Sequence, residues 1–597
     1  MKPLGLVGLA LLCASPVRAL EFTVQQTDGK PASLVMATLV PQEAAPVDRT
    51  DNGYAQPGQL QPGDRWRTAF SDARGTIRFD LPAGPANYRV RLRKPGYTDL
   101  SLENLIATDS QTIVIHAETD AQTLAAAKPA NVWAAEIHVG TPEQDKQFRL
   151  QCSFCHQQGT AFIRSERSPD QWRETIRRMI GYGARLSTAL QAVAPERLQT
   201  GYAALREHPE RLAAPLEWQE ALSQTRVDEW PIGDAMSQIH DMLLHDNGMV
   251  YVGDNIQDRL YEVDPKSGHY TVYKLPRDPG DTLGGLIAAR LAKFPKHESF
   301  LALHSLAASA KDGHIFMTPS VQRRIVEFDP ATKQFKIHHL KDGLYPHTIR
   351  IDAQDRVWFT LSLSNQVGMI DRATGEQHFI DLPTRSIGES LTIRLVPLLF
   401  KLASLGMPLA ALPIDDRSSG APLPYGVEVA PDGAIWIARL HANDLIRIDP
   451  VTLAPTRIDF PALGPRRLRA DAAGNLWITA FAEGAIYRYD PKRAAYDRFE
   501  MPTLPKGTDT PYSLNVDRAR GIVWVTGTGS DTLDALEIST GKWSVVPLPH
   551  RMTFTRDIEI ANDGSVYSAN GAFPAWQIEG AQPTLIRVTP QWAQGAP

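Results

Sequence analysis

The sequence predicts a multidomain, mainly β protein with an N-terminal β-sandwich, a small α-helical domain and a C-terminal seven-bladed β-propeller. Apolar and polar residues alternate through residues 20–120, as in strands with one buried face. Helical spacing replaces this alternation over residues 133–222. Over residues 225–597, a unit of four short β-rich runs recurs seven times, which is typical of a propeller. A chain of 597 residues is also too long for a single hydrophobic core.

Residues 1–19 predict an export signal. Lys2 gives a positive start, an apolar run follows over residues 4–14, and Ala19 is a small residue at the expected cleavage point. We therefore expect a periplasmic mature protein. A net charge of −5 gives no basic surface, which excludes nucleic acid as an expected partner.

The sequence predicts no stable transmembrane span. The most apolar stretch lies near residues 391–412, but it contains Arg394, Lys401 and two prolines. It belongs to a predicted helical insertion in the propeller at about residues 384–420. Two interpretations stay open for it, a partly buried helix and a lid that leans on a membrane.

The N-terminal region is predicted to be a β-sandwich because short alternating runs, such as Thr76–Phe79 and Tyr88–Leu92, are separated by turn residues. The stretch Thr68–Thr76, with Leu81–Gly84 and Gly96-Tyr97, resembles the carboxypeptidase-regulatory-like sandwich family. The resemblance implies an adhesion or spacer module without catalysis.

The helical domain contains the motif Cys152-Ser153-Phe154-Cys155-His156. Helices are predicted from Pro142, after the capping residue Thr141, and from Pro169. Once the signal is removed, Cys152 and Cys155 are the remaining cysteines, and two cysteines at this spacing rarely form a structural disulfide. A dithiol redox pair and half of a zinc site are the alternatives to haem, but no second cysteine pair and no βαβ pattern accompany the motif.

The motif predicts one covalently attached haem c. Two thiols separated by two residues can add to the two haem vinyl groups, and the adjacent His156 can ligate the iron. Met179 is the tentative distal iron ligand, with core packing of Met179, His208 as ligand and an open iron position as alternatives. The motif, with Arg164, Trp172 and Arg178-Met179, resembles the haem segments of quinohaemoprotein amine dehydrogenase over about forty residues. That enzyme's second haem and quinone subunit are absent, so amine oxidation is not implied.

The propeller is predicted from seven inner-strand units, each followed by a β-rich run such as Val357-Trp358-Phe359-Thr360 or Leu476-Trp477-Ile478-Thr479. The last unit lacks an outer strand, and an isolated run, residues 226–231, precedes the first unit. We expect this run to complete blade seven and to close the ring.

The repeat resembles the streptogramin B lyase (virginiamycin B lyase-like) family over about 360 residues, through Pro346–Asp352, Val357–Thr360 and Asn365–Ile370. In that family a glutamate that helps to hold magnesium follows the Trp-Phe-Thr element. Here the position is Leu361, and Arg439 and Ala480 stand at the parallel positions. The resemblance therefore implies a shared fold without the lyase carboxylate.

The starts of the inner strands are predicted to bring polar side chains to one mouth of the central channel. Such residues suit a metal ion or an anionic, aromatic substrate, although a polar, water-filled channel is an equal alternative. The candidate catalytic residues are His240, His304, His347, Tyr425, Arg466, Tyr512 and Arg556, with Asp241, Arg467 and Asp557 beside them.

The leading functional interpretation is a periplasmic oxidoreductase. The propeller would bind a small-molecule substrate or a partner, and the haem would pass electrons to a soluble or membrane-bound electron-transfer partner. A non-enzymatic electron-transfer or binding scaffold and a haem-independent lyase are the alternatives.

Overall fold

The structure is a computed structural model, and it describes residues 18–42, 60, 64–81, 87–106, 110–288, 298–405, 407 and 421–593. The predicted signal peptide lies outside these residues, except for Arg18 and Ala19, which begin the first strand. The protein is mainly β, with six four-stranded sheets, one three-stranded sheet and one eight-stranded sheet among the described residues.

Seven blades form a closed ring. In each of the first six, four antiparallel strands pair in chain order. The innermost strand of each blade contacts that of the next, and the seventh contacts the first. The strands of these six blades are β9 (Ile239–Leu244), β10 (Val250–Asp254), β11 (Arg259–Val263), β12 (Tyr270–Lys274), β13 (Leu303–Ala308), β14 (Ile315–Pro319), β15 (Arg324–Asp329), β16 (Gln334–His339), β17 (Pro346–Ile351), β18 (Arg356–Leu361), β19 (Gln366–Asp371), β20 (Gln377–Asp381), β21 (Pro424–Val429), β22 (Ile435–Arg439), β23 (Asp444–Ile448), β24 (Pro455–Asp459), β25 (Pro465–Ala470), β26 (Leu476–Ala480), β27 (Ala485–Asp490), β28 (Ala495–Glu500), β29 (Pro511–Asp517), β30 (Ile522–Gly527), β31 (Thr532–Glu537) and β32 (Trp543–Pro547).

The second strand of a blade is apolar on both faces because it packs between neighbouring blades. Trp358, Trp436, Trp477 and Trp524 stand at equivalent places in four blades and are almost fully buried. The indole N–H of Trp358 donates to Asp352, and that of Trp477 donates to Asp471, so the turn aspartate also satisfies the buried donor.

Blade seven is completed by a strand that precedes blade one. It consists of β33 (Glu559–Ile560), β34 (Val566–Ala569), β35 (Thr584–Pro590) and β8 (Thr225–Pro231), and β8 pairs antiparallel with β35 along its whole length. This is the pairing that the isolated run 226–231 predicted. It closes the ring between two parts of the chain that are more than 350 residues apart.

The other edge of β8 pairs with the N-terminal region. Trp66 to Ala69 of β3 pair with Glu229 to Arg226, so the sheet of blade seven continues through β3, β2, β5 and β6. A second sheet, β4-β1-β7, packs on this extension around Phe22, Phe79 and Tyr88. The strands are β1 (Arg18–Gln26), β2 (Met36–Pro41), β3 (Trp66–Phe70), β4 (Thr76–Leu81), β5 (Asn87–Arg93), β6 (Leu100–Ile106) and β7 (Ser110–Ile115).

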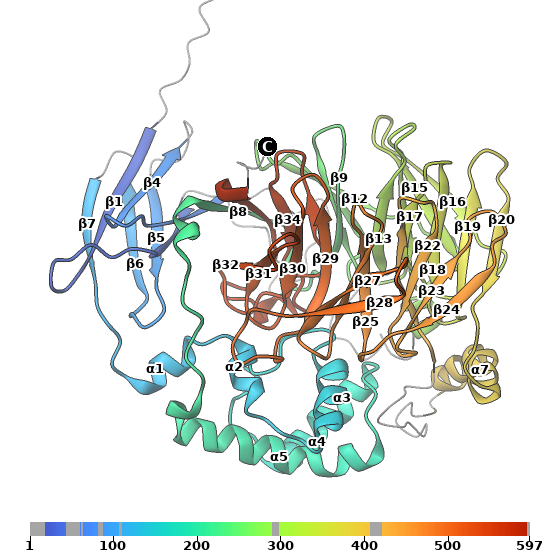
Figure 1. The fold of residues 1–597 in the computed structure, drawn as a ribbon, viewed down its shortest axis with the longest axis horizontal. Coiled ribbons are helices and arrows are strands. Elements are labelled where there is room, and N and C mark those ends of the chain that lie inside the picture. The colour runs from blue at the N-terminus through green and yellow to red at the C-terminus, as the bar shows by residue number, and fades with distance from the viewer. Residues whose placement is uncertain are drawn as a thin grey trace, which may run out of the picture.

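The helical region lies against one face of the ring (Figure 1). Thr141 and Ser168 each form a capping box at the start of a helix that has proline in its first turn, as the sequence predicts. A long third helix was not predicted individually. The helices are α1 (Ala121–Ala126), α2 (Ala130–Ala135), α3 (Pro142–Cys152), α4 (Pro169–Gly181) and α5 (Thr188–Glu207), with short 3₁₀ turns at Pro209–Arg211 and Glu220–Gln224.

The insertion after blade three contains α7 (Ile387–Ser404). Leu391, Leu395, Leu398 and Leu402 recur at helical spacing and are 37–56 % exposed, so this face of α7 is less covered than the partly buried interpretation expects. The rest of the predicted insertion, residues 406 and 408–420, lies outside the described residues. Every helix within the described ranges is too short or too polar to cross a bilayer.

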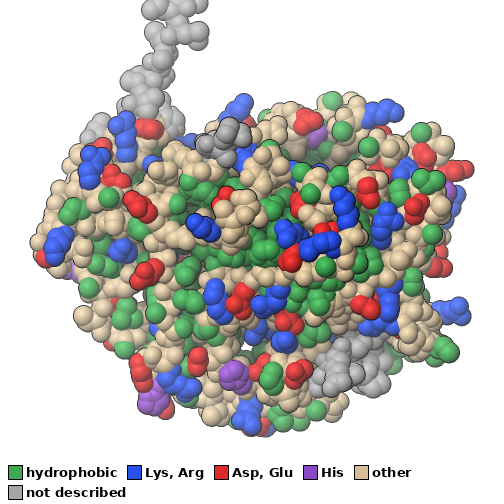
Figure 2. Space-filling view, in the orientation of Figure 1, with side chains coloured by type: hydrophobic (Ala, Val, Ile, Leu, Met, Phe, Trp, Pro, Cys, Tyr) green, Lys and Arg blue, Asp and Glu red, His purple; other side chains and the backbone are tan. Residues whose placement is uncertain are grey.

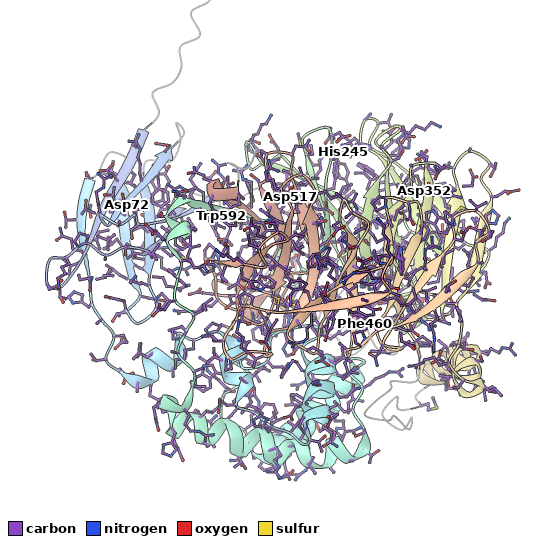
Figure 3. The ribbon with its side chains drawn as sticks, in the orientation of Figure 1. Asp72, His245, Asp352, Phe460, Asp517 and Trp592 are labelled. Carbon is purple, nitrogen blue, oxygen red and sulfur yellow. The ribbon has the colours of Figure 1, made fainter. Side chains whose placement is uncertain are left out.

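The inner strands start on the face that the helices cover. His245 follows β9, Asp352 follows β17 and Asp517 ends β29, and Figure 3 shows all three on the opposite face of the ring. Acidic and basic side chains are mixed across the view in Figure 2, without a large area of one sign.

Candidate functional site

The first residues of six inner strands, with the segment before β33, bring the predicted channel residues together. All seven candidates are at most 8 % exposed, so they form a closed polar cluster rather than an open funnel. The imidazole rings of His240 and His304 have centroids 4.2 Å apart, those of His304 and His347 are 4.3 Å apart, and Tyr425 lies 4.0 Å from His347.

One hydrogen-bonded chain runs through the cluster. The Asp241 carboxylate accepts a hydrogen bond of 2.9 Å from Nδ1 of His240. Nε2 of His240 is therefore the acceptor nitrogen of the neutral ring, and it lies 3.3 Å from the Tyr512 hydroxyl. The hydroxyls of Tyr512 and Tyr425 are 2.6 Å apart.

Arginines surround the two tyrosines. Arg466 donates to the Tyr425 hydroxyl at 2.9 Å, and Arg556 donates to the Tyr512 hydroxyl at 3.1 Å. Arg467 forms two hydrogen bonds with Asp241, at 2.7 and 2.9 Å. Burial raises the pKa of Tyr512, but the guanidinium groups of Arg466, Arg556 and Arg467 outweigh it, and the net pKa is lowered.

The Cys-Ser-Phe-Cys-His segment lies directly on this cluster. The Phe154 ring meets the Tyr425 ring edge-on at 6.3 Å, and the Arg466 guanidinium carbon lies 4.3 Å from the centre of the Phe154 ring. Nη2 of Arg556 is 3.5 Å from the carbonyl oxygen of Cys155. The motif is therefore adjacent to the side chains that the propeller places at its mouth.

Further hydrogen bonds fix the helical region on blades five and six. The Gln157 amide donates to Asp531 and to the carbonyls of Thr528 and Thr553, at 2.6–2.8 Å. Arg149 donates to the carbonyl oxygens of Ala482 and Gly507. Sequence reasoning missed these docking residues because an ordinary polar residue on a helix carries no sign of its partner.

The motif residues have the chemistry that haem attachment requires. Cys152 ends α3, and both thiols are free. Nδ1 of His156 bonds the carbonyl oxygen of Gln157 at 3.1 Å, which leaves Nε2 of the neutral ring as the nitrogen with a free lone pair. Burial lowers the pKa of His156 and raises that of Cys152 to about 12.

Met179 is half-buried on α4. Its neighbours Trp172, Ile176 and Ile180 are buried in the core of the helical region. Cys152 is partly buried and packs against that core. Within the described part of the chain no contact joins Met179 to His156, so its role as distal ligand stays a prediction.

The channel metal also stays a prediction. In the part of the chain that the structure describes, no group of three or more His, Cys, Asp or Glu side chains is arranged to hold a metal ion. The three histidines instead bond protein groups: His240 bonds Asp241, His304 bonds Asn255 and Ser320, and His347 bonds Thr348.

A small pocket lies beside the motif, between α2, α3 and blade six. It encloses about 80 Å³, less than the 300–1,000 Å³ of a typical small-molecule site. Asn131, Arg149, Ser153, Gln157 and Tyr202 are among its lining residues.

Leu361 stands at the position that holds the glutamate in the streptogramin B lyase family, and Arg439 and Ala480 lie at equivalent places in two other blades. Leu361, Arg439 and Ala480 each end a second strand, opposite the proline that starts the inner strand. Leu361 and Ala480 are buried and apolar, and Arg439 forms a buried ion pair with Asp444 at 2.5 Å. None of the three supplies the carboxylate that the resemblance requires.

The channel histidines are expected to make the protein sensitive to acid. Burial lowers the pKa of His240 to about 4, although the hydrogen bond with Asp241 opposes the shift. Burial also holds the pKa of His304 and of His347 well below the ordinary value. A histidine with a lower pKa in the folded state loses its stabilising contribution as pH falls from the unfolded value, about 6.5, towards the folded value.

Between pH 7 and pH 5, the free energy of unfolding is therefore expected to fall by about 2 kcal/mol less in His240→Asn than in wild type. Urea unfolding at both pH values measures this difference. Burial raises the pKa of Glu559 and of Asp258 to about 7, so these two carboxyls stabilise the folded state as the pH falls over the same interval. The variant is therefore compared with wild type, which contains the same two carboxyls. His339→Asn, on outer strand β16, is the control, and equal pH dependence in wild type and His240→Asn would contradict the prediction.

Comparison with known proteins finds similarity in solved structures alone. No protein-family model and no curated protein matches the chain. Virginiamycin B lyase from Staphylococcus aureus is 15 % identical, with a TM-score of 0.45 over 61 % of this chain and 99 % of the lyase. A second streptogramin B lyase structure is 15 % identical, with a TM-score of 0.46 over 62 % of this chain and 100 % of that chain.

The extracellular domain of the putative one component system BT4673 from B. thetaiotaomicron is 14 % identical. Its TM-score is 0.38, over 58 % of this chain and 40 % of that chain. At such identities and TM-scores, none of these similarities assigns an activity to the chain.

Proposed function

We propose that this chain is an exported monohaem c-type cytochrome that passes single electrons through its haem to a soluble or membrane-bound partner. The observation that carries the proposal is the position of the attachment motif on the mouth of the propeller. Cys155 contacts Arg556, and Phe154 contacts Arg466 and Tyr425. The helical region therefore presents the motif to a fixed, positively charged environment.

The residues fit the group. Cys152 and Cys155 would hold the haem through two thioethers, and His156 would ligate its iron. When bound, the haem supplies reversible one-electron oxidation and reduction of iron. The hydrogen bond from His156 to the Gln157 carbonyl orients the imidazole, and the hydrogen bonds of Gln157 to blade six hold that carbonyl in place.

Oxidation of a small substrate in the channel is the second candidate, because histidine, tyrosine and arginine converge there. Electron transfer without a channel substrate is better supported. The seven candidate side chains are at most 8 % exposed and most of them are bonded to protein groups, so a substrate larger than a small anion would have to displace protein contacts.

The test uses full-length protein purified from the periplasm of a host with a working haem-attachment system. Its mass is expected to exceed that of the mature polypeptide by one haem, and its visible spectrum to change on reduction and on mixing with an oxidised soluble cytochrome. Colourless protein of polypeptide mass would overturn the haem assignment. A haem that exchanges no electrons with any soluble or membrane-bound carrier would overturn the electron-transfer role.

A further inference from the structure

Four arginine side chains among the described residues have no exposed surface, and three of them are neutralised by an aspartate. A buried cation without a counter-charge is strongly unfavourable, so such pairing is expected. Arg466 has no carboxylate within 4.0 Å in the described part of the chain. The three pairs are Arg259–Asp234 at 2.8 Å, Arg439–Asp444 at 2.5 Å and Arg467–Asp241 at 2.7 Å.

Two of the three guanidinium nitrogens of Arg466 also lack a hydrogen-bond partner. Nη2 donates to Tyr425, but Nε and Nη1 are buried without an acceptor. Four aromatic rings surround the group, and they offset part of its charge but accept no ordinary hydrogen bond. Their centres lie 3.6–4.8 Å from the guanidinium carbon and belong to Phe154, Tyr425, Phe481 and Tyr512.

Arg556 adds a second positive charge beside the first. It is 3 % exposed and donates to the Tyr512 hydroxyl, but it forms no ion pair with a carboxylate of the described residues. The positive potential of the two arginines, with Arg467, acts on the Tyr512 oxygen strongly enough to lower its pKa despite burial. The mouth of the channel therefore favours a negative charge that the described residues do not supply.

We propose that Arg466 and Arg556, with the hydroxyls of Tyr425 and Tyr512, bind a small carboxylate or oxyanion beneath Phe154. Phe154 is the half-buried member of the four rings, whereas the other three are buried, so it is the side that an anion can reach. The ligand is either a free anion or a propionate carboxylate of the haem. Only this choice of source rests on the proposed function.

Formate is the probe, and chloride at equal ionic strength is its reference. The haem-free full-length variant Cys152→Ala/Cys155→Ala is expected to rise in Tm by at least about 2 °C between 1 and 100 mM formate. A similar rise in the haem-loaded protein identifies a free anion as the ligand. No rise in that protein identifies the haem propionate. If the haem-free variant does not fold, wild type made without haem attachment replaces it.

Arg466→Met is expected to abolish the formate effect and to raise the Tm measured without formate, because it removes an unneutralised buried cation. A residue with a purely structural role would show the opposite sign. Arg439→Met is the matched control: it breaks a paired arginine, lowers the Tm and keeps the formate effect. If Arg466→Met does not fold, Arg556→Gln is tested for the same loss.

Three results would overturn the anion site. They are the absence of a formate effect in both haem-free and haem-loaded protein, an unchanged effect in Arg466→Met, and tyrosinate absorbance in wild type at neutral pH, which would make Tyr512 the counter-charge. If wild type carries no haem, the formate measurements still decide the proposal, so its failure and that of the proposed function are distinguishable.

Discussion

Replacing Cys152 and Cys155 together by alanine is expected to give a colourless protein with the mass of the mature polypeptide alone. The two thioether bonds of the proposed haem could not form, and His156 by itself would not hold a haem covalently. Intact-protein mass and the visible spectrum of periplasmic material measure the result. Because the expected loss of covalent haem is complete, this is the largest change that we predict.

Ser153→Ala is the matched control, since Ser153 lies between the two cysteines and contributes no attachment atom. It is expected to keep the full haem content. A double alanine variant with haem still covalently bound would place the attachment elsewhere, and a haem-free Ser153→Ala protein would show that the segment tolerates no substitution.

Asp241→Asn is expected to lower the free energy of unfolding by about 3–5 kcal/mol, because it leaves Arg467 charged and unpaired inside the ring. Arg467 and Asp241 are 0 % and 1 % exposed and are joined by two hydrogen bonds. The same substitution removes the carboxylate that accepts from His240. Urea unfolding at pH 7 measures the loss.

Asp170→Asn is the control for this pair. Asp170 bonds Arg173 on the surface of α4, where both side chains are about half or more exposed, so the expected loss is below about 1 kcal/mol. Equal losses in the two variants would mean that solvent reaches the channel pair, contrary to the burial of Asp241.

The propeller was predictable because each blade repeats a local pattern. A turn aspartate, an apolar strand with a central aromatic residue and a second turn recur, and Trp358 and Trp477 occupy the same place in their blades. Closure by residues 226–231 followed from one missing strand and one surplus strand. The pairing of β3 with β8 was not predictable, because a strand edge carries no sign of which other edge it meets.

The candidate site was predictable to a similar degree. Inner strands start at the same mouth, so His240, Tyr425 and Arg556 could be placed together from the repeat alone. The burial of the cluster could not be predicted, because Phe154 and Gln157 come from the helical region, whose orientation on the ring depends on scattered hydrogen bonds. The lack of a carboxylate beside Arg466 is likewise a property of three-dimensional packing.

Because β8 pairs with β35 on one edge and with β3 on the other, the N-terminal sandwich is a lateral extension of the seventh blade. Separating β8 from β35 would open the propeller and expose the unpaired edge of β35 at once. The sandwich is therefore joined to the seam of the ring by strand pairing between β3 and β8, not by a flexible tether. A partner that bound the sandwich would hold the Cys152–His156 segment, which lies on the mouth of the same ring, at one fixed angle to itself.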